Sequence, residues 1–219
     1  MLSIVKDASF DQVQIPMGIL EVRMPPRQDW QPGRLRREEV RRTGLLRAGA
    51  GSYDRQEAFG ENPYYRYYKR YKKTYPVLQQ LESFLLKGRP FPQDDPLQEI
   101  AFLVELETRA LVGMHDGDRV EGQVVLYRAP GREDFLARGN RPAHTYPEDV
   151  TARDDRGVIL SMIAGPDSRT ALHPDTVHPV YLVFGTPGME AAYVQGILDR
   201  LSALVGLLAP GAEQLPRLL

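Results

Sequence analysis

The chain has 219 residues, of which 42% are hydrophobic and 26% charged, proportions that are ordinary for a globular protein and argue against disorder along the whole chain. Its formal net charge is -1, so no overall positive field draws it to nucleic acid, and an anion-binding surface has to come from local clustering. There is no cysteine, which excludes disulfides, thiolate metal sites and a cysteine nucleophile.

The first 48 residues predict two strands, a linker and a basic helix. Short apolar runs at residues 2–5 and 19–22 are typical of strands, and residues 24–33 are rich in proline and glycine, as in a linker. Residues 34–48 are rich in arginine, with two glutamates three or four positions before arginines. That spacing favours ion pairs within a solvated helix.

Targeting signals are not evident. The N-terminal residues show neither the basic segment nor the long apolar run of a signal peptide. No apolar stretch reaches the ~18 residues expected of a membrane span. We therefore expect a cytoplasmic protein that has no membrane partner.

Residues 62–89 are rich in tyrosine, lysine and arginine. Asn62 followed by Pro63 is a helix N-cap with proline at the first helical position, so a helix should begin there. Six of the eleven tyrosines fall between residues 64 and 75, and those at 64, 68, 71 and 75 form one helical stripe. Pro76 should break the helix. Basic residues occupy an adjacent face: Arg66, Lys69, Arg70, Lys72 and Lys73.

This segment has two interpretations. Basic side chains beside aromatic rings can neutralise phosphates and stack on unpaired bases, which is typical of RNA binding. Alternatively, the tyrosines are the buried face of the helix and the basic residues its solvated side. Both hold together if the tyrosine stripe points inward and the cations point outward toward phosphate.

The rest of the chain predicts a change from helices to strands. Asp95 and Pro96 cap a largely apolar helix that we expect to be buried and to end near Gly113. Short strands are predicted beyond Gly122, and Thr186-Pro187 should open a last helix with one apolar stripe. The predicted strands span residues 124–129, 135–137, 150–153, 158–164 and 180–184. Helices first and strands later indicate an α+β fold.

The run YKKTYPVLQQLESFLLKG at residues 71–88 resembles a signature of stand-alone proteins built on the B3/B4 domain, the editing module of the β-subunit of bacterial phenylalanyl-tRNA synthetase. The stretches at residues 96–107, 113–129, 149–165 and 166–184 resemble that synthetase domain in chain order, so the resemblance covers roughly residues 50–187. It implies a three-layer domain with a β-sandwich of unusual topology flanked by helices. We accordingly divide the chain into residues 1–48, 49–187 and 188–219.

In the synthetase, the domain hydrolyses tyrosine wrongly esterified to tRNA. The resemblance matches His115 in GMHD to the loop histidine of the editing pocket, and it matches Ser161, Ala164 and Gly165 to the strand and turn that line it. Asp116 adjoins the histidine and joins this candidate substrate pocket. The synthetase has a glutamate on its closing strand, but residues 179–184 contain no acid, so the amino acid recognised does not follow from the resemblance.

Three roles remain open for His115. A histidine near carboxylates can relay a proton near neutral pH, can contact substrate without catalysis, or can stabilise a turn. Ser161 lacks the context of a nucleophile and is interpreted as pocket lining.

We expect no metal and no cofactor. Asp116, Asp118 and Glu121 lack the spacing of a calcium loop. The four histidines include no helical zinc pair, and no phosphate-binding loop is present.

The leading hypothesis is a trans-editing hydrolase that deacylates mischarged aminoacyl-tRNA. The alternatives are a non-catalytic tRNA- or RNA-binding module, and a small-molecule binder that uses the pocket for an amino-acid-like ligand. No motif for ATP-dependent amino-acid activation is present, so the chain should not charge tRNA. We expect tRNA or aminoacyl-tRNA as partner, no DNA, and a monomer or homodimer.

Overall fold

Strands from both ends and the middle of the chain form one antiparallel sheet. The computed structural model describes residues 1–11 and 13–219. In this sheet the order is β11 (Glu213–Leu218), β2 (Met17–Arg23), β10 (Pro179–Phe184) and β3 (Val112–Asp116). One sheet therefore combines strands from all three segments into which the sequence was divided.

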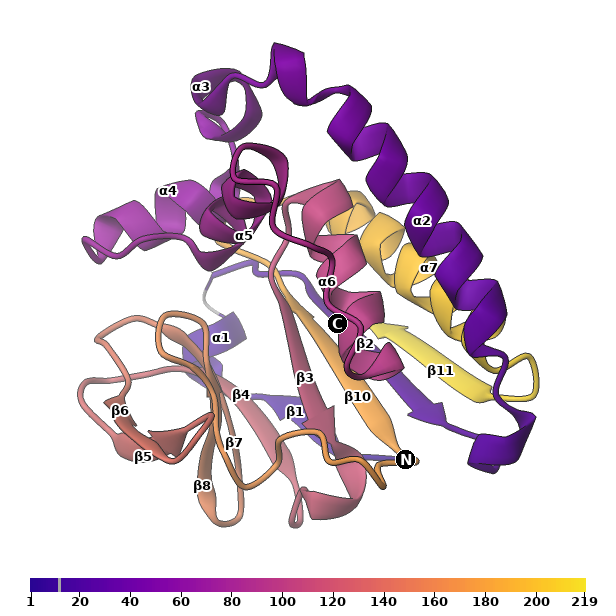
Figure 1. Ribbon diagram of the computed structural model, residues 1–219. Coiled ribbons are helices and arrows are strands. Elements are labelled where there is room, and N and C mark those ends of the chain that lie inside the picture. The colour runs from indigo at the N-terminus through magenta and orange to yellow at the C-terminus, as the bar shows by residue number, and fades with distance from the viewer. Residues whose placement is uncertain (12) are drawn as a thin grey trace.

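A second sheet packs against the first. Its order is β1 (Ile4–Lys6), β4 (Val124–Arg128), β7 (Val150–Asp154), β8 (Gly157–Ser161) and β9 (Gly165–Pro166), with only β1 and β4 parallel. A Cβ atom at Gly113 of β3 would lie 2.7 Å from the side chain of Leu160 in β8, so the two sheets approach closely there. The separate hairpin of β5 (Asp134–Ala137) and β6 (Arg141–His144) extends this side of the molecule (Figure 1).

Helices cover the outer face of the four-stranded sheet. A Cβ atom at Gly18 of β2 would meet Val194 at 2.7 Å and Leu198 at 3.0 Å, both on α7 (Ala191–Leu208). Beside α7 lies α6 (Pro96–Thr108), and α2 (Pro32–Ala48) crosses outside both (Figure 1). Helices, one sheet and the second sheet thus form three layers, and the predicted α+β class is confirmed.

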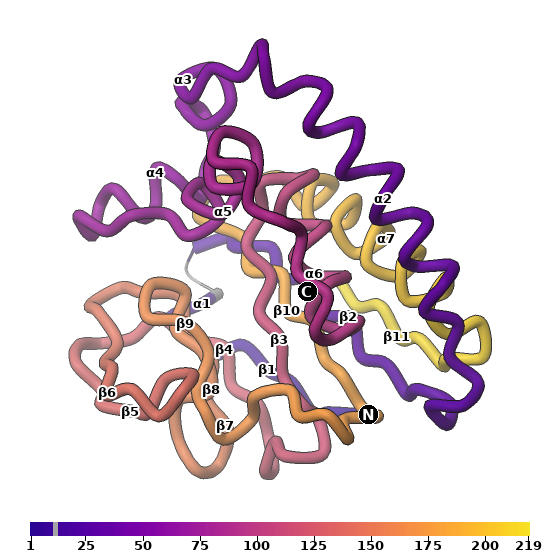
Figure 2. The backbone as a smooth tube through the Cα atoms, in the orientation of Figure 1, coloured from indigo at the N-terminus to yellow at the C-terminus, as the bar shows by residue number. Residues whose placement is uncertain are grey.

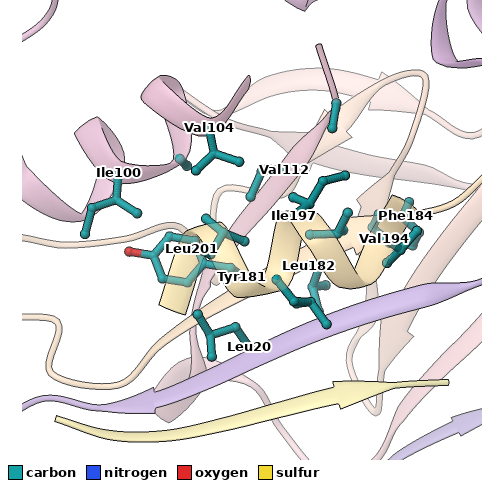
Figure 3. Packing of buried hydrophobic residues seen from close by; sticks show 14 of the residues in the cluster. Leu20, Ile100, Val104, Val112, Tyr181, Leu182, Phe184, Val194, Ile197 and Leu201 are labelled. Carbon is teal, nitrogen blue, oxygen red and sulfur yellow. The ribbon is translucent and has the colours of Figure 1, made fainter. Parts of the chain in front are cut away.

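The apolar side chains of α6, α7 and the four-stranded sheet meet in the main core (Figure 3). Every residue of β10 is buried, because helices cover one of its faces and the second sheet covers the other. The buried hydroxyl of Tyr181 in β10 has a hydrogen-bond partner, since it donates to the Leu97 carbonyl at 3.0 Å.

Helix α7 is apolar because it packs in this core. It is long and apolar enough to cross a membrane, contrary to the expectation from the sequence that no stretch would be. Its apolar stripe, which includes Val194, Ile197 and Leu201, is buried in the core. A buried core helix meets the same criteria of length and composition, so this property needs no membrane.

The remaining helices are short. They are α1 (Ala8–Asp11), α3 (Arg55–Phe59), α4 (Pro63–Arg70) and α5 (Pro76–Leu85), with 3-10 turns at Arg27–Asp29, Ala50–Ser52 and Gly117–Arg119. The backbone trace shows α4 over the loops that join β6 to β7 and β8 to β9 (Figure 2).

Several predicted boundaries were wrong. The helix expected to reach Gly113 ends at Thr108, because Arg109 adopts a left-handed conformation (φ 58°) and caps it. The residues that follow form strand β3, so His115 lies in a strand and not in a loop. The last helix begins at Ala191 and not near Thr186, and the short strand β11 beyond it was not predicted.

Candidate nucleic-acid interface

Helix α4 begins and ends with specific capping contacts. The Asn62 side chain accepts a 2.9 Å hydrogen bond from the Tyr65 backbone N–H, and proline occupies the first helical position, as predicted. At the other end, Lys72 is left-handed (φ 55°) and the Lys73 N–H donates to the Tyr68 carbonyl at 3.1 Å. This is the pattern of a Schellman cap, and it turns the chain sharply after four basic residues.

The inner face of α4 is fixed by tyrosine hydroxyls. Tyr67 donates to Oδ1 of Asp149 at 2.9 Å and Tyr68 donates to the Met162 carbonyl. Tyr71 donates to the Pro147 carbonyl at 3.1 Å. These bonds hold the helix over the second sheet, and burial raises the pKa of both the Tyr67 and the Tyr68 hydroxyl, so they remain donors.

The predicted tyrosine stripe is nearly as expected. Tyr64, Tyr68 and Tyr75 are fully buried, whereas Tyr71 is half-buried and Tyr67, outside the predicted stripe, is buried as well. The reason is that α4 lies between the core and the loop before β7, so two of its sides are covered.

Three of the five predicted cations lie on the outer face of α4, and Lys72 and Lys73 lie in the turn after its last residue, Arg70. All five are exposed: Arg66, Lys69, Arg70, Lys72 and Lys73. Among the residues that the structure describes, only Arg66 has a carboxylate partner, Glu61. Two of the lysines instead cover aromatic rings, with Lys69 Nζ 4.5 Å from the Tyr65 ring centre and Lys73 Nζ 5.0 Å from that of Tyr146. The five form a cationic face whose charges are mostly available to an outside anion.

A cleft of about 690 Å³ adjoins this face. It lies between α4, the turn after α6 and the loop before α7, and Arg66, Arg70 and Arg109 all line it. The Arg109 backbone is held in place because Asn62 Nδ2 and the Tyr75 hydroxyl donate to its carbonyl at 3.2 and 2.8 Å. Acidic Glu57, Glu61 and Glu190 lie on the same cleft, which makes its lining mixed in charge.

His115 lies in the interior, 1% exposed. Its Nδ1 is 2.7 Å from the hydroxyl of Thr170, which itself donates to Asp167. The Thr170 oxygen therefore accepts from Nδ1–H, and Nε2 keeps a lone pair that has no partner in the described structure. Burial, followed by the charge of Arg169, lowers the histidine pKa to about 4, so the ring is neutral at pH 7.

The Asp116 carboxylate stabilises the turn after β3. It accepts from the Thr176 hydroxyl at 2.8 Å and from the Asp118 backbone N–H at 3.1 Å, and it caps the 3-10 turn that follows β3. These bonds occupy both carboxylate oxygens of Asp116.

The other three pocket residues gather around Asp149. Ser161 donates to the Asp149 carboxylate and accepts from the Ala164 backbone N–H at 2.9 Å. Gly165 follows with φ 91°, a conformation that favours glycine. Within the described ranges, no hydrogen bond joins this group to His115 or Asp116. These hydrogen bonds leave the two groups unlinked, although strand β9, which begins at Gly165, lies beside β3. The part of these residues in catalysis or substrate binding stays a prediction.

Sequence reasoning missed two residues near α4. Asp149 is fully buried, and burial raises its pKa to about 6, although the Ser161 and Tyr67 hydroxyls oppose that rise. Tyr146 contacts both Lys73 and Tyr71. Neither position has a local pattern that would reveal it, because their partners lie about 70 to 80 residues earlier in the chain.

Comparisons with known proteins leave the family open. No protein-family model and no curated protein matches the sequence. Among solved structures, an N-terminal fragment of the phenylalanyl-tRNA synthetase β-subunit from Pyrococcus horikoshii is similar with a TM-score of 0.48 and 11% identity, covering 97% of this chain and 50% of that one. This chain therefore spans about half the length of that fragment. The likeness is a weak structural one and assigns neither family nor function.

Proposed function

We propose that the protein binds RNA through the cationic face of α4, with tRNA or aminoacyl-tRNA as its partner. One observation carries the proposal. Lys69, Arg70, Lys72 and Lys73 are exposed and have no carboxylate partner among the described residues, although acidic side chains outnumber basic ones in the chain by 29 to 28. Four uncompensated cations at the end of α4 and in the turn after it are the local cluster that an anionic polymer requires.

The neighbouring aromatic side chains favour unpaired over paired RNA. Tyr65, Tyr71 and Tyr146 are half-buried and lie beside the cations. Unpaired bases stack on such rings while lysine and arginine contact the phosphates. The loops and the 3′ end of a tRNA offer unpaired bases of this kind.

Binding can be measured by fluorescence anisotropy with a labelled tRNA at several salt concentrations. Replacing the four unpaired cations by glutamine should weaken binding and reduce the slope of log K against log[salt] by ~0.7 for each lost phosphate contact. The matched control replaces four exposed cations elsewhere, Arg34, Arg37, Lys87 and Arg89. Equal losses in both variants would show that binding follows overall charge, and the proposed interface would be wrong.

A second candidate function is hydrolysis of the ester in mischarged aminoacyl-tRNA. The observation that favours it is the neutral His115 ring with a free Nε2 lone pair. The unprotonated Nε2 can accept a proton, but its pKa of about 4 makes it a weak base at neutral pH. The ester is already activated, so one oriented water molecule can suffice for its cleavage.

Deacylation of tRNAs carrying correct and incorrect labelled amino acids tests this candidate. His115→Ala should abolish clearance of the mischarged species, whereas the four-cation variant should mainly weaken retention of the tRNA. If His115→Ala still deacylates the mischarged tRNA, His115 is not the catalytic base. Retention without clearance of any species would leave a binding module, and binding of a free amino acid without tRNA would support the small-molecule alternative.

A further inference from the structure

Four aromatic rings make a continuous row beside the cationic face. The ring centres of Tyr67 and Tyr71 are 5.2 Å apart, those of Tyr71 and Tyr146 are 5.9 Å apart, and those of Tyr146 and His144 are 4.9 Å apart. Tyr67 is buried, but the other three rings are half-buried. This aromatic row runs from helix α4 to the end of strand β6.

The outer end of the row is not part of the core. Tyr71 packs against the hydrophobic core cluster, whereas Tyr146 and His144 do not belong to that cluster or to its half-buried surroundings, as far as the structure describes them. The Tyr146 hydroxyl likewise has no hydrogen bond within the described residues. Core packing therefore does not account for an aromatic side chain at position 146.

The turns that carry Tyr146 and Lys73 each contain one residue with an uncommon backbone conformation. Four non-glycine residues in the described structure have positive φ, and two of them, Glu148 (φ 66°) and Lys72 (φ 55°), lie in the turns that position Tyr146 and Lys73. The turn at 148 is fixed because the Asp149 N–H donates to the Tyr146 carbonyl at 3.0 Å and the Glu148 N–H donates to the Ala129 carbonyl at 2.8 Å. The conformation of Lys72 belongs to the cap of α4, whereas the positive φ of Glu148 costs free energy, and such conformations concentrate at functional sites.

The flexible side chain of Lys73 covers the ring of Tyr146. Lys73 Nζ lies 5.0 Å from the ring centre. A cation–π contact at an exposed site is weak, and the lysine stem is flexible. A flat ligand can therefore displace the ammonium group from this ring at little cost.

We propose that the ring of Tyr146 is a stacking site for one unpaired RNA base, and that Lys73 moves from the ring to the adjoining phosphate when the base enters. This inference rests on the proposed RNA-binding function and names the place where a base is held. Lys73 lies beside the ring, and the exposed Arg70 and Lys72 are close to Lys73 in the chain, which disfavours a cationic occupant such as a methylated ammonium group. In a nucleotide, the base can stack on the ring while the phosphate contacts the cations.

The test compares two ligands on three proteins. The ligands are an oligoadenylate of about 12 nucleotides and an abasic strand of the same length. The proteins are the wild type, Tyr146→Leu, which removes the ring, and Tyr146→Phe, which keeps it. Thermal unfolding of each variant checks that the fold is retained.

We expect Tyr146→Leu to weaken oligoadenylate binding by roughly 5- to 100-fold, the range for loss of one stacked base. Tyr146→Phe should bind as the wild type does, and the abasic strand should bind all three proteins equally. Unchanged oligoadenylate binding by Tyr146→Leu, or equal weakening of both strands, would overturn the stacking site while RNA binding itself stands. Failure of the wild type to bind either strand or tRNA would instead overturn the proposed function.

Discussion

The hydroxyl of Tyr67 donates a 2.9 Å hydrogen bond to the buried carboxylate of Asp149 and also accepts one of 2.7 Å from the Val150 N–H. Through this single oxygen, the helix that carries the exposed cations is joined to the start of β7. Because Ser161 donates to the same carboxylate, Asp149 connects the cationic face to the residues that the sequence assigned to a substrate pocket.

Removing the Tyr67 hydroxyl should destabilise the protein. Tyr67→Phe leaves the buried Val150 N–H and one Asp149 oxygen without their partner, at a cost of ~1–3 kcal/mol in the free energy of unfolding. Urea unfolding measures this. The matched control is Tyr71→Phe, whose hydroxyl bonds the Pro147 carbonyl in an exposed position and should cost under ~1 kcal/mol. Equal effects would mean that the buried hydroxyl is not the connection we describe.

Stability should fall as the pH rises, because of Glu105. Burial raises the pKa of its carboxyl from 4.5 to about 8, although the Val112 N–H donates to it. Between these values the unfolded chain releases a proton that the folded protein keeps, so the free energy of unfolding declines by up to ~1.4 kcal/mol per pH unit.

Glu105→Gln keeps an oxygen acceptor for Val112 and removes this titration. Urea unfolding at a series of pH values measures the effect. We expect the free energy of unfolding of the variant to rise relative to that of the wild type as the pH increases from 4.5 toward about 8. Parallel stability curves for the two proteins would show that Glu105 is already ionised in the folded state.

Two glycines should respond to alanine in opposite directions. At Gly185 a Cβ atom would lie 2.3 Å from the backbone oxygen of Pro16, so Gly185→Ala should cost ~1–3 kcal/mol as strands shift. Gly196 is exposed in α7 and a Cβ atom there meets nothing within 4 Å. Gly196→Ala should stabilise the protein by up to ~1 kcal/mol. Thermal or urea unfolding measures both, and a tolerated Gly185→Ala would contradict the close strand contact.

Helix α2 should depend on Arg200 for its attachment. Arg200 of α7 bonds Glu107 of α6 at 2.7 Å and Glu38 of α2 at 3.0 Å, while α2 itself buries little more than Leu35 and Glu39. Arg200→Gln leaves the nearly buried Glu107 with one fewer cation and should speed hydrogen exchange of α2 amides more than those of the sheet.

The control for that experiment is Arg41→Gln. Arg41 is exposed and pairs with Glu38 within α2 itself, so its loss should leave stability and exchange nearly unchanged. If exchange in α2 is unaffected by Arg200→Gln, apolar contacts rather than ion pairs hold the helix.

The sequence determined those features that arise from near neighbours in the chain. Asn62 and Pro63 start α4 where predicted, Asp95 and Pro96 start α6, and the apolar runs at residues 19–22 and 180–184 form β2 and β10. Helix caps and apolar periodicity depend on residues a few positions apart, so they can be read locally. The outward direction of Arg66, Lys69 and Arg70 on α4 followed from the same periodicity.

Only the tertiary structure decided how these elements make a site. It placed His115 in the interior, joined Ser161 to Asp149, and brought Tyr146 beside Lys73. Each outcome depends on pairing between segments far apart in sequence, because β3 lies beside β10 and the loop before β7 lies under α4. Burial and the partners it supplies set the charge state of a histidine or a carboxyl, and a one-dimensional pattern does not contain them.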